Sequence, residues 1–134
     1  MPGYLLDTNH LSAAIRRVSP IRDRISQTIR QGIRVGTCVP VICELEAAIE
    51  QTKRPAACRG TLDRLLREVR VWPVDRQLAR VFGEIYGDLR RRGRVLSHVD
   101  IVLAALARSM KLTILTTDRD FEALPDIPTE DWLR

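Results

Sequence analysis

In the stretch Gly3–Asn9, GYLLDTN, a short apolar run ends abruptly in a carboxylate, that of Asp7. Strands buried in parallel sheets are apolar along their length, and open α/β sheets bind ligands beyond the carboxyl ends of their strands. Asp7 therefore has two interpretations. It is either an acid at the carboxyl edge of a sheet or the N-cap of a helix predicted over residues 8–17, because Asp is a favoured N-cap residue.

The length of 134 residues predicts one domain over residues 1–134, with a core that needs no disulfide or metal to hold it together. The three cysteines, Cys38, Cys43 and Cys58, form no C-x-x-C pair and give no indication of a zinc site or a disulfide framework. The longest apolar run, residues 101–107, is too short to cross a bilayer, and no signal peptide pattern is present. We therefore expect a soluble, cytoplasmic protein.

The formal net charge is +5, and nearly all of the positive residues are arginines. The planar guanidinium group suits bidentate contacts to phosphate, so the charge favours a nucleic acid as partner. Solvated helix faces in an arginine-rich sequence explain the same composition. Three of these residues, Arg91, Arg92 and Arg94, surround Gly93 at a predicted helix end. There they either complement the helix dipole or contact the phosphates of a nucleic acid.

A motif similar to the opening stretch occurs near the end of the chain. Residues 113–115 form a second predicted apolar strand, and Thr116-Thr117-Asp118 follows it as Asp7-Thr8 follows the first. Between the two strands, Glu44 and Asp100 each lie in the first turns of a predicted helix. Each has a simpler explanation alone, because Glu44 could be a solvated surface residue and a helix dipole could stabilise Asp100. The recurrence of acids at element ends favours a shared site.

Four carboxylates at one sheet edge would repel one another strongly unless a cation lay among them. Hard oxygen ligands without accompanying His or Cys favour Mg²⁺ or Mn²⁺ over zinc. Such an ion lowers the pKa of a bound water and neutralises charge on phosphate oxygens. The sequence therefore predicts metal-dependent hydrolysis of phosphodiester bonds.

The order of these motifs resembles the PIN-domain ribonucleases and, among them, the VapC-type toxins of bacterial toxin–antitoxin systems. The matching stretches are Leu5–Asn9, Glu44–Leu45, Asp100–Ala105 and Leu115–Phe121. The resemblance implies a single α/β/α three-layer domain with a central parallel sheet. It also implies a Mg²⁺-dependent endoribonuclease that forms homodimers and is inhibited by a small cognate antitoxin protein.

The resemblance also assigns site residues. Asp7, Glu44, Asp100 and Asp118 fall on the acidic positions of the family, and we expect Asp7 and Asp100 to be direct or water-mediated metal ligands. Three small polar residues and a reserve acid match the positions around them: Thr8, Asn9, Thr116 and Asp120.

We expect both histidines, His10 and His98, to be packing or surface residues. His98, near the rim of the site, is also a candidate for contact with RNA, as are Arg91, Arg92 and Arg94. The segment 38–43, CVPVIC, departs from the hydroxyl-rich stretch usual before the glutamate, and Ala48 replaces a frequent glycine. Both departures lie in the scaffold and leave the acidic positions intact.

Two alternatives remain open from the sequence. An aspartyl-nucleophile phosphatase also begins with an apolar strand ending in Asp, although its usual second Asp is replaced here by Asn9. Neither Lys53 nor Lys111 stands where that chemistry would need a phosphate-binding lysine. The other alternative is a non-catalytic nucleic-acid-binding module whose acids serve only as helix caps.

Overall fold

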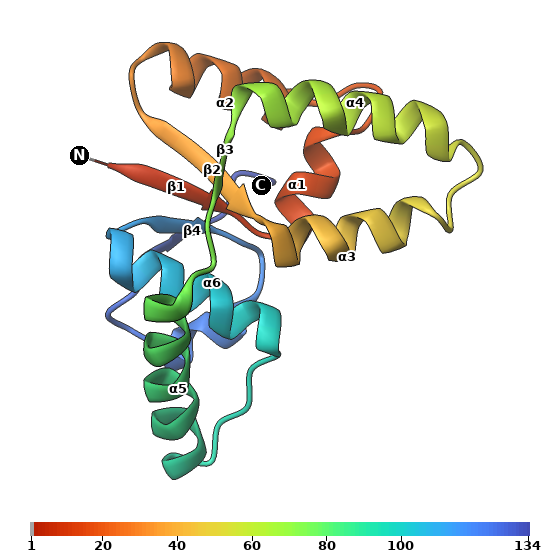
Figure 1. The fold of residues 1–134 in the computed structure, drawn as a ribbon. Coiled ribbons are helices and arrows are strands. Elements are labelled where there is room, and N and C mark those ends of the chain that lie inside the picture. The colour runs from red at the N-terminus through yellow and green to blue at the C-terminus, as the bar shows by residue number, and fades with distance from the viewer. Residues whose placement is uncertain (1) are drawn as a thin grey trace.

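The structure, a computed structural model, describes residues 2–134 and contains a parallel sheet with helices on both of its faces (Figure 1). The elements in chain order are β1 (Gly3–Leu6), α1 (Thr8–Ala14), α2 (Pro20–Arg30), β2 (Arg34–Cys38), α3 (Val39–Ile49), α4 (Pro55–Glu68), β3 (Arg70–Trp72), α5 (Arg76–Arg91), α6 (His98–Met110), β4 (Thr113–Leu115), the 3-10 helix η1 (Arg119–Ala123) and β5 (Thr129–Glu130).

The five strands are arranged in the order β3-β2-β1-β4-β5, and every neighbouring pair is parallel. The first strand therefore lies at the centre of the sheet, with β2 on one side and β4 on the other. The predicted central parallel sheet is confirmed. The prolines of the tail, residues 124–132, predict an edge strand there and not a central one, and β5 lies at the edge of the sheet.

The helices complete a three-layer arrangement, as predicted. Figure 1 shows α5 and α6 on one side of the sheet and α1, α2 and α4 on the other. Between these layers the central strands are largely buried, with Leu5, Leu6, Ile114 and Leu115 inaccessible to solvent. The strands are apolar because both of their faces pack against helices.

The first helix is shorter than predicted, since α1 ends at Ala14 and not at Arg17. Side chains of the following segment bind its last carbonyl groups. Ser19 Oγ donates to the Ala13 carbonyl at 2.8 Å, and Arg22 Nη1 donates to the carbonyls of Ala14 at 2.9 Å and Arg16 at 2.7 Å. These bonds satisfy groups that another helical turn would otherwise have to satisfy.

The second strand runs from Arg34 to Cys38. The sequence predicts a strand at residues 33–35 that leads through Gly36 and Thr37 to Cys38, and the structure extends the strand itself over Gly36, although glycine is disfavoured in strands. The structure gives the reason for the glycine. A Cβ atom there would lie 2.6 Å from Trp72 Cζ3 and 2.7 Å from the Arg70 carbonyl oxygen of β3. Strand β2 therefore continues to the end of the sheet, where α3 begins directly after it.

None of the helices in residues 2–134 is long and apolar enough to span a bilayer.

Candidate metal site at the carboxyl edge of the sheet

The two strands that precede Asp7 and Asp118 end side by side. Leu6 of β1 is in register with Leu115 of β4, and the Asp7 backbone amide donates to the Leu115 carbonyl at 3.1 Å. Because the strands are parallel, the residues that follow them leave the sheet at the same edge. The similarity of the two motifs thus places them next to each other in space.

Asp7 is buried, with 6% of its surface exposed, and it is the N-cap of α1. Its Oδ1 atom accepts a hydrogen bond from the His10 backbone amide at 2.8 Å and contacts His10 Nδ1 at 3.1 Å. Both contacts use the same oxygen, which leaves Oδ2 for a further partner. Helix capping and ligand binding, the two interpretations of Asp7, are therefore compatible.

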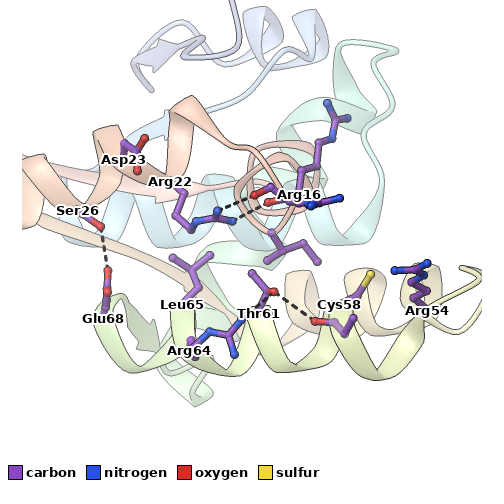
Figure 2. A pocket seen from close by; sticks show the side chains of 13 residues that line it. Arg16, Arg22, Asp23, Ser26, Arg54, Cys58, Thr61, Arg64, Leu65 and Glu68 are labelled. Atoms are coloured by element: carbon purple, nitrogen blue, oxygen red, sulfur yellow. Dashed lines mark hydrogen bonds between the residues drawn. The ribbon is translucent and has the colours of Figure 1, made fainter.

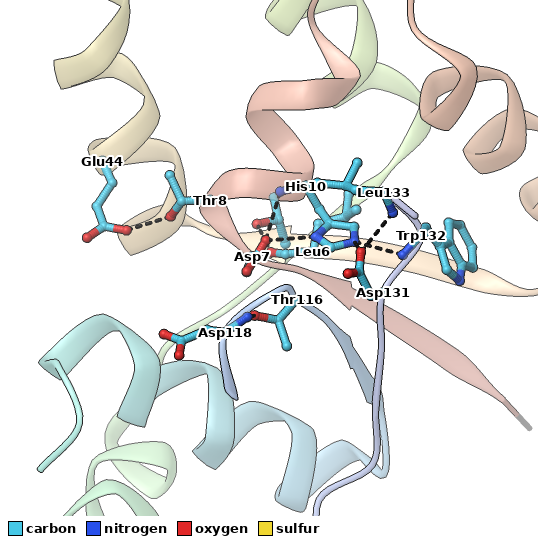
Figure 3. A network of polar contacts seen from close by, with 11 residues as sticks. Leu6, Asp7, Thr8, His10, Glu44, Thr116, Asp118, Asp131, Trp132 and Leu133 are labelled. Atoms are coloured by element: carbon cyan, nitrogen blue, oxygen red, sulfur yellow. Dashed lines mark hydrogen bonds and ion pairs between the residues drawn. The ribbon is translucent and has the colours of Figure 1, made fainter. Parts of the chain in front are cut away.

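Glu44 lies on α3 and is linked to the first motif through Thr8. The Thr8 hydroxyl donates to Glu44 Oε1, a contact between residues 36 positions apart in the chain. Figure 3 shows this pair beside Asp7, with Asp118 below them in the view. Since Glu44 is exposed, the hydroxyl of Thr8 restricts a side chain that would otherwise sample many rotamers.

Asp118 is held by the polar residues around it. Its backbone amide donates to Thr116 Oγ1 at 2.9 Å, and its Oδ1 accepts from the Asp120 amide at 2.8 Å, so Asp118 caps η1. Thr116 is buried, whereas Asp120 is exposed. The side chain of Asn9 is also exposed, on the first turn of α1.

Asp100 is the fourth acid, and the other three influence its charge. It lies in the first turn of α6, where its backbone amide donates to Ser97 Oγ at 3.1 Å. The pKa of its carboxyl group is raised to about 6, chiefly because the group is partly buried. The charges of Asp118, Glu44 and Asp7 contribute to the rise, and the hydrogen bond with Ser97 opposes it. The structure therefore brings together the four acids that the sequence singles out, each from a different element.

The donor set fits a hard divalent cation, although it does not form a closed cage. Within residues 2–134, no three Asp, Glu, His or Cys side chains converge closely enough to hold an ion by themselves. Mg²⁺ usually keeps several waters and binds proteins through one or two carboxylates, so an open acidic cluster suits it. Burial is the main cause of the elevated pKa of Asp100, and repulsion from the other three acids adds to it. A bound cation would relieve that repulsion.

His10 is a contact of the site that the sequence interpretation missed. It is fully buried, its Nδ1 faces Asp7, and its Nε2 accepts a hydrogen bond from the Trp132 backbone amide at 3.0 Å. Figure 3 shows the ring between Asp7 and the C-terminal tail. A signal was available in the sequence, because His10 is three residues after Asp7 and such residues face each other across a helical turn.

The residues predicted to contact RNA lie on α5, on α6 and between them. Arg91, Arg92, Arg94 and His98 are all exposed. Arg92 Nη2 lies 2.7 Å from Asp88 Oδ2, so its charge is partly compensated within the helix. His98 begins α6, two residues before Asp100. Contact with RNA stays a prediction for all four.

A cavity of about 660 Å³ lies elsewhere, between α4 and the segment that joins α1 to α2 (Figure 2). Arginines dominate its charged lining, including Arg16, Arg22, Arg54 and Arg64. Arg22 is committed to the carbonyl groups at the end of α1. A site with this charge does not attract a metal cation, so the cavity does not compete with the acidic edge as a metal site.

The model of the PIN domain family matches residues 4–127. The chain therefore belongs to the PIN-domain family, as the resemblance in the sequence predicted, and its relatives within that family are VapC proteins.

Three of these relatives cover nearly the whole chain. The tRNA(fMet)-specific endonuclease VapC of Salmonella typhimurium is 31% identical over 135 residues, which is 98% of this chain and 99% of that protein. The crystal structure of DNA-bound VapBC from Salmonella typhimurium gives a TM-score of 0.84 at 27% identity, covering 98% and 99% of the two chains. VapBC-5 from Mycobacterium tuberculosis, a member of the VapBC family of toxin–antitoxin systems, gives 0.67 at 27% identity, covering 96% of each.

Proposed function

We propose that this chain is a Mg²⁺-dependent endoribonuclease and the toxin component of a type II toxin–antitoxin system. The observation that carries the proposal is geometric: β1 and β4 end side by side, so Asp7 and Asp118 leave the sheet at one edge. Thr8, next to Asp7, binds Glu44 of α3, and the charges of these acids reach Asp100 in the first turn of α6. Membership of the PIN-domain family and the names of the VapC relatives support ribonuclease activity. Mn²⁺ has the same preference for oxygen ligands and is expected to substitute.

In this proposal each acid has a defined task. Asp7 and Asp100 hold the ion, directly or through water, while Glu44 and Asp118 complete the negative field around it. Thr8 orients Glu44, and Thr116 orients the turn that carries Asp118. A bound divalent cation lowers the pKa of a water molecule and neutralises charge on the phosphate oxygens during hydrolysis. Asn9 and Asp120, both exposed near these acids, are proposed to orient waters around the ion.

The substitution Asp7→Asn tests the proposal with little risk to the fold. Asparagine caps helices about as well as aspartate, so α1 keeps its N-terminus while the site loses one charge. We expect Mg²⁺-dependent cleavage of an RNA panel to fall at least about 100-fold, because a metal ligand is lost. The matched control is Asp63→Asn on the exposed face of α4, which removes the same charge outside the acidic cluster. Unchanged cleavage by the Asp7 variant would refute the site.

We also propose two protein partners. The solved relatives are VapBC complexes, which supports pairing of this chain with a cognate antitoxin. The resemblance further supports a homodimer. Light scattering on the purified chain, alone and together with the product of an adjacent small open reading frame, tests both. A monomer that ignores that product would contradict the two partner assignments while leaving the nuclease proposal intact.

A further inference from the structure

We propose that His10 and the backbone amide of Trp132 act together as a positioning device for Asp7. In this view the C-terminal tail fixes the tautomer of the His10 ring, and the ring fixes the orientation of the Asp7 carboxylate. The inference rests on the proposed function, because it assigns a task toward the same metal site. It makes His10 a positioning residue and not a catalytic one.

The hydrogen-bond partners of the ring define its tautomer. The Trp132 backbone N–H can only donate, and it lies 3.0 Å from His10 Nε2, so Nε2 must accept. The ring hydrogen is then on Nδ1, which lies 3.1 Å from Asp7 Oδ1 and donates to it. Since His10 is fully buried, water does not supply an alternative partner to either nitrogen.

Asp131 is the other group near the ring, and its carboxylate is engaged elsewhere. Its Oδ1 lies 3.6 Å from His10 Nε2, beyond hydrogen-bonding distance, and accepts from the Leu133 amide at 2.8 Å. Its Oδ2 lies 3.1 Å from Arg134 Nε. The amide of Trp132 is therefore the group that decides the state of Nε2.

Contacts that do not involve His10 anchor the tail, so the tail can hold the Trp132 amide in a fixed position against the His10 ring. The Trp132 ring packs against Tyr4 of β1 with 4.9 Å between centroids, and the Arg24 guanidinium lies 4.0 Å above it. Its indole nitrogen donates to Glu130 Oε1 at 3.2 Å. The backbone amide is thus held in place by contacts to the central strand and to α2.

The contacts with His10 fix the orientation of the Asp7 carboxylate. Two hydrogen bonds from His10, one from the backbone amide and one from the ring, converge on Oδ1 and oppose rotation of the group. Oδ2 is then presented in one direction, which reduces the entropy lost when an ion binds. Groups that orient metal ligands in this way typically change metal affinity 10–100-fold.

Two substitutions of His10 separate its two hydrogen bonds. In His10→Asn the side-chain amide takes the place of Nδ1 and can still donate to Asp7. In His10→Gln the amide takes the place of Nε2 and can contact only the tail. We expect His10→Gln to weaken Mn²⁺ binding about 10-fold by calorimetry without RNA, and His10→Asn to stay within about threefold of the unmodified chain. Equal affinities for all three would overturn the proposal.

A kinetic measurement distinguishes positioning from a loss of structure. For His10→Gln we expect a lower kcat at limiting Mn²⁺, an unchanged KM for RNA and recovery of kcat when the metal concentration is raised. A defect that excess metal does not rescue would mean that His10 is only a core residue, which overturns the proposal.

The contribution of the tail is tested at Trp132. Both Trp132→Ala and Trp132→Pro lose the indole, but only the proline lacks the backbone N–H. We expect weaker Mn²⁺ binding for proline than for alanine, and equal binding would refute the part assigned to the amide.

A spectroscopic measurement on the unmodified chain tests the His10 tautomer without any substitution that could disturb folding. The ¹⁵N chemical shifts of the His10 ring report its tautomer without metal, RNA or turnover. We expect hydrogen on Nδ1, and hydrogen on Nε2 would overturn the proposal. If the unmodified chain shows the expected tautomer but cleaves no RNA with Mg²⁺ or Mn²⁺, then the proposed function fails and the tautomer assignment stands.

Discussion

At the scale of one residue, ionisation of the Asp100 carboxyl group is expected to lower the free energy of unfolding. Its pKa of about 6 in the folded chain exceeds its usual value of 3.8, so the folded state binds its proton more tightly than the unfolded state does. Without metal, stability should therefore fall as pH rises from about 4 to about 6 and stay lower above that range. Asp100→Asn removes this penalty.

We expect Asp100→Asn to raise the free energy of unfolding at pH 7.5 by about 1 kcal/mol, less than the full pKa shift implies because the group is partly exposed. At pH 4.5 the gain should be much smaller. Urea unfolding with EDTA at both pH values measures the difference. A gain that is the same at the two pH values would contradict the prediction, because it would then be independent of ionisation.

Residues of the site differ in how far the sequence could predict them. Asp7 and Asp118 were predictable because each follows an apolar strand, and parallel strands deliver their ends to one edge. For His10, the spacing from Asp7 was a local signal, but its contact with Trp132, 122 positions away in the chain, was not predictable. Which backbone amide faces a buried ring depends on how the tail docks, and no local pattern encodes that.

At the scale of elements, β2 depends on Gly36 for its fit against β3. A Cβ atom there would meet the Arg70 carbonyl oxygen and the Trp72 ring, and neither backbone nor buried indole can move freely. We expect Gly36→Ala to lower the free energy of unfolding by about 1–3 kcal/mol, as overpacking does. The matched control is Gly83→Ala in α5, where nothing lies within 4 Å and a gain of about 0.5–1 kcal/mol is expected. Urea unfolding measures both, and a neutral Gly36 variant would contradict this account.

Whether a segment forms a helix or a strand was predictable where its hydrophobic pattern was long. The residues at which helices and strands begin and end were harder to predict. The dipeptide Ser19-Pro20 predicts a helix start with Ser19 as the cap, and α2 begins there because capping is a local interaction. The end of α1 depends on Arg22, which binds carbonyl groups six and eight residues earlier. The extent of β2 likewise depends on Trp72 of the neighbouring strand. Both boundaries are set by contacts outside the element concerned.

At the scale of the whole molecule, the acidic edge lies close in the chain to one cluster of exposed arginines. The acids gather where β1, α3, α6 and the turn after β4 meet, whereas exposed arginines lie around the end of α5. A polyanion drawn to the arginines would be brought near the acidic edge, because α6 begins at His98, close behind the arginine-bearing segment, and carries Asp100 in its first turn. RNA binding and metal binding are thus expected to use adjacent parts of one surface.

The arginine pair Arg91 and Arg94 tests this arrangement. Replacing both with alanine, in an Asp7→Asn background that prevents cleavage, should weaken binding to single-stranded RNA. It should also reduce the slope of log K against log salt concentration by about 1.4, or about 0.7 for each phosphate that is no longer neutralised. Replacing Arg64 and Arg67 removes the same charge from α4, on the other side of the sheet (Figure 1), and should leave the slope nearly unchanged. Equal slopes for the two double variants would show that only net charge matters and would return Arg91 and Arg94 to the role of complementing the dipole of α5.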